Sequence, residues 1–220
     1  MKKLVIFDLD GTLLNTIEDL GRAANHALSV NGFATHSIAS YPFFVGNGVR
    51  KLLERVLPED IQKDAVIDKM LVDFKQYYNE HNTDYTTPYA GIPELLADLQ
   101  EEGVKLAVAS NKYDLATQKL VTHYFPDIKF AAIEGQKEGI PVKPDPSIIF
   151  SILAQAKERK ADTLYVGDSG VDMETARRAC VDSVGVTWGF RPEKELIEYH
   201  AGSIINKPSE IETIVEQYNG

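Results

Sequence analysis

The sequence predicts an α/β fold: a doubly wound parallel sheet with an all-helical insertion after its first strand. A buried strand opens the chain, residues 15–86 show helical periodicity without a convincing strand, and strands alternate with helices from residue 87 onward. Such alternation is typical of parallel sheets covered by helices on both faces. We therefore expect a core formed by residues 1–14 and 87–220, with residues 15–86 as a helical cap domain.

The opening strand ends in two acids. An apolar run from Leu4 to Phe7 leads directly into Asp8, and Asp10 and Gly11 follow. The carboxyl end of a strand in an open α/β sheet opens onto the ligand crevice. Both carboxylates should therefore be within reach of a ligand.

Three helices are expected in the insertion. The first follows Asn15, which we expect to cap it together with Glu18; the second begins near Gly48, and the third spans residues 62–78. Apolar residues recur at helical spacing in each. They are Ile17, Leu20, Ala24 and Leu28 in the first, Val49, Leu52, Leu53 and Val56 in the second, and Val66, Met70, Phe74 and Tyr77 in the third.

After the insertion, predicted strands alternate with predicted helices. Short apolar runs predict strands, and the stretches between them have helical periodicity. The expected strands are 104–109, 130–133, 163–166 and 184–187, and the expected helices lie around 95–99, 115–124, 146–153 and 173–180, with a last helix near 209–215.

Composition narrows the function classes. The chain has 220 residues, 44% hydrophobic and 25% charged, with a formal net charge of −10. This acidic balance disfavours nucleic acid and anionic membrane surfaces as partners. No stretch approaches the length of a membrane span, the apolar start is broken too early for a signal peptide, and the single cysteine suits a reducing compartment. We expect a cytoplasmic protein.

Four polar clusters follow predicted strands. They are Asp8 with Asp10, Ser110-Asn111-Lys112, Lys143-Pro144-Asp145, and Gly167-Asp168-Ser169-Gly170-Val171-Asp172. A parallel sheet brings the carboxyl ends of its strands to one edge, so the clusters should share one pocket. Several carboxylates at one place require a cation, and all-oxygen ligands favour Mg²⁺. A metal with open coordination positions suits a phosphate.

The order and the residue types of the four clusters resemble those of the haloacid dehalogenase-like superfamily of phosphatases, and within it the phosphoglycolate phosphatase group. Asp8-Leu9-Asp10-Gly11-Thr12 is similar to the first motif of that family, and the other three clusters are similar to its second, third and fourth motifs. The segment Phe44-Val45-Gly46-Asn47-Gly48 also resembles the cap of the phosphoglycolate group. The resemblance implies a Rossmann-like core with an inserted cap.

The resemblance also implies roles. Asp8 would be the nucleophile that forms an aspartyl phosphate, and Asp10 would protonate the leaving group and later deprotonate water. Mg²⁺ would be held by Asp8, Asp168 and the main-chain carbonyl of Asp10. Ser110 and Lys143 would bind the phosphoryl oxygens, and Asp172 would order Lys143 or a metal-bound water. Two further residues, Thr12 and Asn111, are expected at the phosphate.

A small phosphorylated metabolite such as 2-phosphoglycolate is the expected substrate. Dehalogenases and phosphonatases of that superfamily lack the second aspartate, so the resemblance at Asp10 disfavours C–halogen and C–P cleavage. Its hexose-phosphate mutases often have Val where Thr12 stands, which favours a phosphatase over a mutase. Three alternatives remain open: a pyrophosphatase or nucleotide phosphatase, a sugar-phosphate mutase, and a non-enzymatic binding module. Substrate choice should lie in the cap, where Arg50 is the candidate to meet a second anionic group.

Overall fold

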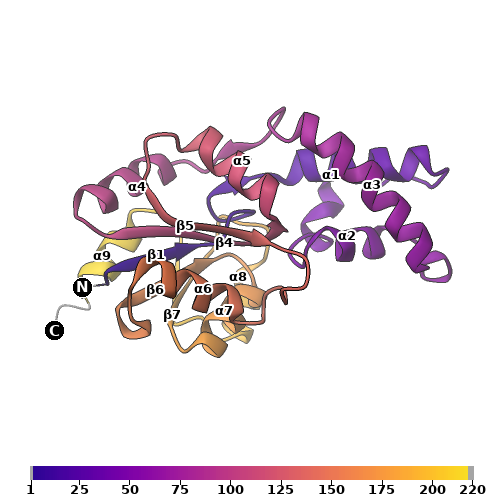
Figure 1. The fold of residues 1–220 in the computed structure, drawn as a ribbon. Coiled ribbons are helices and arrows are strands. Elements are labelled where there is room, and N and C mark those ends of the chain that lie inside the picture. Colours follow the sequence, from indigo (N-terminus) through magenta and orange to yellow (C-terminus); the bar gives the residue numbers. More distant parts are fainter. Residues whose placement is uncertain (1, 218–220) are drawn as a thin grey trace.

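The computed structural model describes residues 2–217, and within them a six-stranded sheet has the order β5-β4-β1-β6-β7-β8 (Figure 1). Its strands are β1 (Leu4–Phe7), β4 (Lys105–Tyr113), β5 (Phe130–Gln136), β6 (Thr163–Gly167), β7 (Asp182–Val186) and β8 (Ser203–Ile205). All neighbouring pairs are parallel. The predicted doubly wound α/β core is confirmed.

Helices cover both faces of this sheet. Side chains alternate between the faces of a strand, and in β1 Val5 and Phe7 pack against α4 (Ile92–Glu101), α5 (Asp114–Tyr124) and α9 (Glu210–Gln217). Leu4 and Ile6 pack against α6 (Ser147–Ala156) and α7 (Gly170–Ala179) on the other face. A short helix, α8 (Glu193–Glu198), follows β7. Because β1 is central and buried on both faces, its carboxyl end is held rigidly.

The helices between residues 17 and 81 form a unit beyond the carboxyl ends of the central strands (Figure 1). Its helices are α1 (Ile17–Val30), α2 (Val49–Val56) and α3 (Asp64–His81), and two 3-10 turns, η1 (Ile38–Phe43) and η2 (Glu59–Ile61), lie between them. Their inward side chains form a hydrophobic cluster of their own, which includes Leu53, Met70 and Phe74. The unit therefore has a core largely separate from the two cores of the sheet.

Two short strands join the helical unit to the sheet. β2 (Leu14–Asn15) and β3 (Thr87–Pro88) pair antiparallel where the chain leaves and re-enters the core. The buried Asp19 carboxylate of α1 accepts hydrogen bonds from the N–H groups of Tyr85 and Thr86 and from the Thr86 hydroxyl. The two connections are thus fastened to each other at the base of the unit.

The local predictions need four corrections. The first helix begins at Ile17 with Thr16 as its N-cap residue, and Asn15 lies one residue earlier, in β2, where its Oδ1 accepts from the Ile17 N–H at 3.4 Å. α3 buries Ile67 and Tyr78 in place of Val66 and Tyr77, a shift of one residue in its apolar face. β4 continues four residues past Ala109. The sequence prediction also lacks four short elements, namely α8, β2, β3 and β8.

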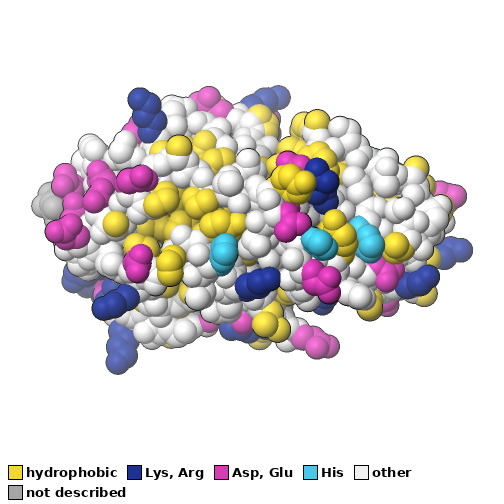
Figure 2. Space-filling model, turned by 90° about the horizontal axis from the view of Figure 1, so that it is seen from above, with side chains coloured by type: hydrophobic (Ala, Val, Ile, Leu, Met, Phe, Trp, Pro, Cys, Tyr) yellow, Lys and Arg dark blue, Asp and Glu magenta, His cyan; other side chains and the backbone are white. Residues whose placement is uncertain are grey.

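The molecular surface is uneven in charge. Acidic side chains gather at the end of the α/β core that lies away from the helical unit (Figure 2). Asp98, Glu101, Glu102 and Glu212 line one hollow, and burial together with Asp98 and Glu102 raises the pKa of Glu212. Among residues 2–217, no helix has both the length and the apolar character to cross a bilayer.

Candidate active site

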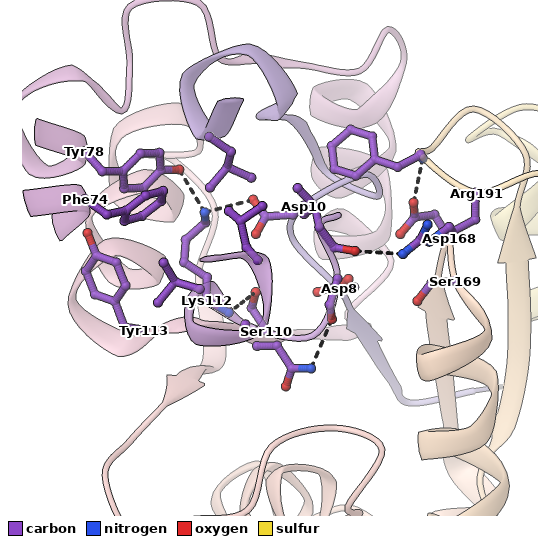
Figure 3. A pocket seen from close by; sticks show the side chains of 18 residues that line it. Asp8, Asp10, Phe74, Tyr78, Ser110, Lys112, Tyr113, Asp168, Ser169 and Arg191 are labelled. Atoms are coloured by element: carbon purple, nitrogen blue, oxygen red, sulfur yellow. Dashed lines mark hydrogen bonds and ion pairs between the residues drawn. The ribbon is translucent and has the colours of Figure 1, made fainter. Parts of the chain in front are cut away.

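The carboxyl ends of four neighbouring strands meet at the sheet edge that faces the helical unit. The loops after β1, β6 and β7 and the last residues of β4 line one cavity there, and α1, α2, α3 and the loop before α2 form its opposite wall (Figure 3). The sheet contributes Asp8, Asp10, Ser110, Asn111, Lys112, Tyr113, Asp168, Ser169, Phe190 and Arg191, and the helical unit contributes mainly apolar side chains. The cavity therefore has a polar floor and an apolar roof.

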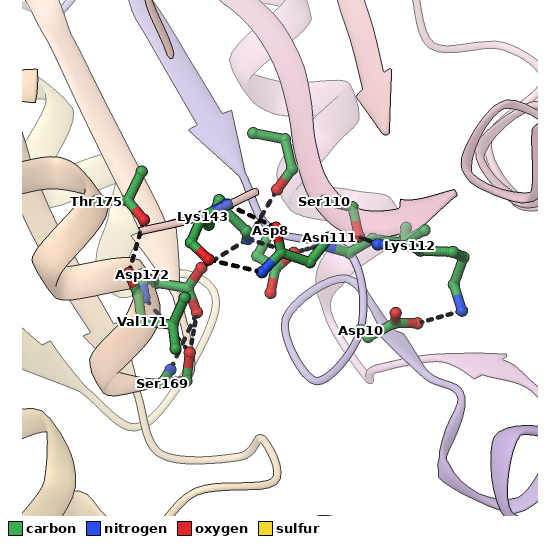
Figure 4. Close-up of polar contacts among 12 residues, drawn as sticks. Asp8, Asp10, Ser110, Asn111, Lys112, Lys143, Ser169, Val171, Asp172 and Thr175 are labelled. Atoms are coloured by element: carbon green, nitrogen blue, oxygen red, sulfur yellow. Dashed lines mark hydrogen bonds and ion pairs between the residues drawn. The ribbon is translucent and has the colours of Figure 1, made fainter. Parts of the chain in front are cut away.

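Lys143 does not itself line this cavity, but it contacts Asp8, which does, and joins Asp8 to the buried Asp172. Its Nζ lies 2.9 Å from Asp8 Oδ1 and 2.8 Å from Asp172 Oδ1, between the two carboxylates (Figure 4). It also donates to the Ala109 carbonyl and the Tyr165 hydroxyl, each at 3.0 Å. The side chain is 1% exposed. Burial alone would lower the pKa of Lys143, but the Asp172 and Asp8 carboxylates outweigh burial and hold it well above its usual range. Lys143 is therefore a fixed positive charge beside Asp8.

Asp8 follows β1 directly, and its backbone N–H donates to the Val166 carbonyl of β6. The pKa of the Asp8 carboxyl is raised to about 7, because burial, the largest cause, and the carboxylates of Asp172 and Asp10 together outweigh the lowering by the Lys143 ammonium. Burial, followed by Asp172 and Asp8, likewise raises the pKa of Asp168 well above its usual range. Too many negative charges thus converge here for Lys143 to offset alone.

Three of these carboxylates are arranged to hold a cation. Oxygens of Asp8, Asp168 and Asp172 all lie within 4.8 Å of one another. A Cβ on Gly11 would lie 2.3 Å from Asp168 Oδ2, and one on Gly189 would lie 2.3 Å from Asp168 Cβ. The two glycines therefore leave the space that the Asp168 carboxylate occupies. The donor set fits a hard divalent cation such as Mg²⁺.

Asp172 belongs to the start of α7. It forms a capping box with Ser169, whose side chain accepts from the Asp172 N–H while Asp172 Oδ2 accepts from the Ser169 N–H. Its other oxygen contacts Lys143. Asp172 thereby fixes the Lys143 ammonium from the helix that follows Asp168.

Asp10 points away from this cluster, toward the helical unit. Its Oδ1 accepts from the Thr16 hydroxyl at 2.6 Å and lies 3.1 Å from Lys112 Nζ (Figure 4). The two aspartates of the first loop thus face different partners. Asp8 contacts Lys143 and lies near the other acids, whereas Asp10 contacts Lys112 and Thr16.

Asn111 ties the parts of the site together. Its amide oxygen accepts from the Lys143 N–H at 2.8 Å, and its Nδ2 donates to the carbonyls of Lys143 and Gly46. Arg191 makes a similar contact from the loop after β7, because it donates to the Val45 carbonyl at 2.8 Å. The loop before α2 is therefore held against the sheet edge by two residues of the core. Ser110 is buried, and its hydroxyl accepts from the Lys112 N–H.

Two predicted site residues lie elsewhere. The Thr12 side chain is fully buried, and among residues 2–217 its hydroxyl has no hydrogen-bond partner. The Thr12 carbonyl accepts from Trp188 Nε1 at 3.0 Å. Arg50 lies on α2, is paired with Asp64 and Asp68 of α3, and does not line the cavity. Its role in substrate binding stays a prediction, which this geometry does not favour.

The sequence reasoning missed Lys112, Phe190 and Arg191 as site residues. Lys112 belongs to the second motif, but the motif resemblance assigns roles only to Ser110 and Asn111. Phe190 and Arg191 follow β7, whose end was not included among the four clusters. Since β7 neighbours β6 in the sheet, its loop had to lie beside Asp168, and Phe190 N–H indeed donates to Asp168 at 2.7 Å.

A parallel α/β core with buried acids and a buried lysine at its strand ends, beneath a helical unit, defines a class of hydrolases. The chain belongs to one family of that class: residues 5–186 match the model of the haloacid dehalogenase-like hydrolases. This match confirms the predicted family and, with the relatives, the enzyme class.

Two relatives with the same name match this chain over most of their length. A phosphoglycolate phosphatase of Mesorhizobium japonicum is 30% identical over 207 residues, which cover 93% of this chain and 91% of that protein. One of Agrobacterium fabrum is 34% identical over 192 residues, covering 86% and 82%. A solved structure from Lactobacillus delbrueckii, provisionally named a phosphoglycolate phosphatase, has a TM-score of 0.91 and 32% identity and covers 98% of this chain and 99% of that one.

Proposed function

We propose that this protein is a Mg²⁺-dependent phosphomonoester hydrolase that works through an aspartyl phosphate on Asp8. The observation that carries the proposal is the pairing of Asp8 with Lys143 beside Asp168 and Asp172. A carboxylate can attack phosphorus only when positive charge offsets the repulsion between two anions, and the site is built to supply that charge. Residues 15–86 would act as a cap that excludes water from the first displacement.

The reaction would proceed in two displacements. An Asp8 oxygen attacks phosphorus, the bond from phosphorus to the ester oxygen breaks, and the leaving alkoxide takes a proton from Asp10. Asp10 then removes a proton from water, whose oxygen attacks the aspartyl phosphate. The bond between phosphorus and Asp8 breaks, and inorganic phosphate is released. Lys143, Ser110 and the Leu9 N–H, which donates to Asp8 Oδ1 at 2.7 Å, would hold the transferring oxygens.

Asp8, Asp168 and the Asp10 carbonyl would hold Mg²⁺, with Asp172 beside them. The bound ion would neutralise charge on the phosphoryl group and orient it. Lys143 would keep a fixed position throughout, since Asp172 and Tyr165 hold it independently of substrate. We propose 2-phosphoglycolate or a similar small metabolite as substrate and a cytoplasmic location.

Metal binding should depend on pH. A carboxyl whose pKa is raised in the folded protein contributes stability at low pH that is lost as the pH rises through the folded value. For Asp8 this window runs from 3.8 to about 7. Mg²⁺ supplies the missing counter-charge, and its ligands must be deprotonated. Mg²⁺ should therefore raise the midpoint of thermal unfolding more at pH 8 than at pH 6.

Thermal unfolding with EDTA and with Mg²⁺ at both pH values measures this effect. Asp168→Asn should remove most of the increase, whereas Asp98→Asn on the exposed face of α4 should keep it. An equal or larger increase at pH 6 would contradict the assignment of these carboxylates to the metal.

A panel of phosphate esters tests the function itself. Phosphate release with Mg²⁺ should be fastest from 2-phosphoglycolate or a related small monoester. Preference for pyrophosphate or a nucleotide would move the protein to the alternative phosphatase class. Conversion of a sugar phosphate to its isomer without phosphate release would show a mutase, and absence of both activities would leave a binding module.

A further inference from the structure

Lys112 is a second buried cation, separate from the lysine that would hold the phosphoryl group. It comes from the extension of β4, lines the cavity, and its side chain is 3% exposed. Its Nζ lies 3.1 Å from Asp10 Oδ1 and donates to the Tyr78 hydroxyl at 2.8 Å (Figure 3). Burying an ammonium is costly unless it is paired. The fold therefore holds a positive charge at a place where the phosphoryl chemistry does not require one.

The position of Lys112 corresponds to the leaving-group side of the site. Lys143 and Asp8 lie on one side of the first loop, and Asp10 and Lys112 lie on the other (Figure 4). Asp10 would touch the ester oxygen, so the carbon attached to that oxygen must pass close to Asp10. A substituent on that carbon then comes within reach of the ammonium paired with Asp10.

The Lys112 ammonium and the Tyr78 hydroxyl can each donate one more hydrogen bond. A lysine ammonium has three N–H groups, and the contacts to Asp10 and Tyr78 use two of them. Burial raises the pKa of Tyr78 well above its usual range, so its hydroxyl keeps a proton. That hydroxyl accepts from Lys112, and among residues 2–217 no acceptor for its own proton is recorded. One donor from the core and one from the helical unit are thus free to meet an acceptor in the cavity.

The surroundings restrict what that acceptor can be. Leu20, Leu52 and Phe74 form the nearby wall of the helical unit, and the Lys112 ammonium lies 4.6 Å from the centre of the Tyr78 ring. An apolar wall with two converging donors, one of them charged, favours a small anion over a neutral polar group. A compact carboxylate meets this requirement.

We propose that Lys112, assisted by Tyr78, binds an anionic group on the carbon next to the ester oxygen, and so selects phosphorylated 2-hydroxy acids over neutral phosphate esters. The proposal rests on the proposed phosphatase function. It assigns to a β4 residue the binding of a second anionic group, which the sequence suggested for Arg50. The Arg50 guanidinium instead forms ion pairs with two aspartates of the helical unit.

Two esters of nearly equal size test this proposal. In 2-hydroxyethyl phosphate a neutral CH₂OH group replaces the carboxylate of 2-phosphoglycolate. The parent protein should have the higher kcat/KM on 2-phosphoglycolate. Lys112→Met should lower the ratio of the two kcat/KM values by at least about tenfold, since a hydrogen bond to a charged group contributes on the order of this factor or more. The KM for 2-phosphoglycolate should rise most, and Lys112→Arg should restore part of the ratio.

Binding of the separate products gives a second readout. Glycolate should inhibit Lys112→Met more weakly than the parent, whereas inhibition by inorganic phosphate should change little. Tyr78→Phe keeps the ring in the cluster and should lower the ratio by a smaller factor, which provides a test if Lys112→Met fails to fold. Lys119→Met is the matched control: Lys119 is exposed on α5 and also contacts the helical unit, through the Asn79 carbonyl, so the ratio should stay at the parent value.

Several outcomes would overturn the proposal. An equal loss on both esters would show that Lys112 only positions Asp10. Collapse of the ratio in Arg191→Met but not in Lys112→Met would give the role to Arg191. A parent that hydrolyses both esters without preferring 2-phosphoglycolate would refute the selectivity and leave the phosphatase intact. A parent that releases phosphate from neither ester, nor from any other in the panel, would instead refute the proposed function.

Discussion

Replacing Asp8 by Asn should lower the rate of phosphate release by more than about a thousandfold, because loss of a covalent nucleophile removes the entire first displacement. Asn has nearly the same size but cannot attack phosphorus as an anion. Lys143 would lose the charge of its partner at 2.9 Å and keep its ion pair with Asp172 at 2.8 Å. The effect should therefore appear in kcat with saturating Mg²⁺ and substrate, and the protein should remain folded.

Asp98→Asn makes the same chemical change on the exposed face of α4 and should keep the parent rate. Thermal unfolding of the two variants separates loss of chemistry from loss of structure. A rate for Asp8→Asn within tenfold of the parent would show that the nucleophile is another group.

Lys143→Met should cause the second large effect, on both activity and stability. Removing a preorganised cation from a transition state costs at least about a hundredfold in rate. The change also leaves the carboxylates of Asp8 and Asp172 facing each other without their shared ammonium. Breaking a buried ion pair in this way should lower the free energy of unfolding by about 3 kcal/mol or more. Denaturant unfolding and phosphate release measure the two effects.

A double mutant separates the two effects. Adding Asp172→Asn to Lys143→Met removes one of the stranded carboxylates, so part of the lost stability should return while the activity stays low. The interaction energy in this mutant cycle should be large because the two atoms lie 2.8 Å apart. Independent, additive losses would contradict the view that the pair is coupled.

The fold was predictable because its signals are local. Short apolar runs that alternate with helical segments identify a parallel sheet. The order of the strands in the sheet depends on which strands pair, and periodicity does not encode that. The prediction failed where polar residues continue a strand. Ser110, Asn111 and Lys112 extend β4 because their side chains find partners in the site and Tyr113 pairs with Gln136 of β5.

The site was predictable where residue type and motif coincide. Asp8, Asp168 and Asp172 are acids at strand ends, and the structure places their oxygens together. Arg191 was missed because its contact is with a backbone carbonyl of the helical unit, which no sequence pattern records. The orientation of Asp10 toward Lys112 also involves Thr16, which directly follows β2. The paired strands β2 and β3 have two residues each and are too short to be recognised from periodicity.

The most direct test of the account is to trap the phosphorylated protein. The parent is mixed with 2-phosphoglycolate and Mg²⁺, or with the best ester of the panel, quenched in acid within one turnover, digested and analysed by mass spectrometry. The account predicts a phosphoryl group on Asp8, absent from Asp8→Asn. A phosphoryl group on another residue such as Ser110, or phosphate release from a protein that never becomes phosphorylated, would contradict it.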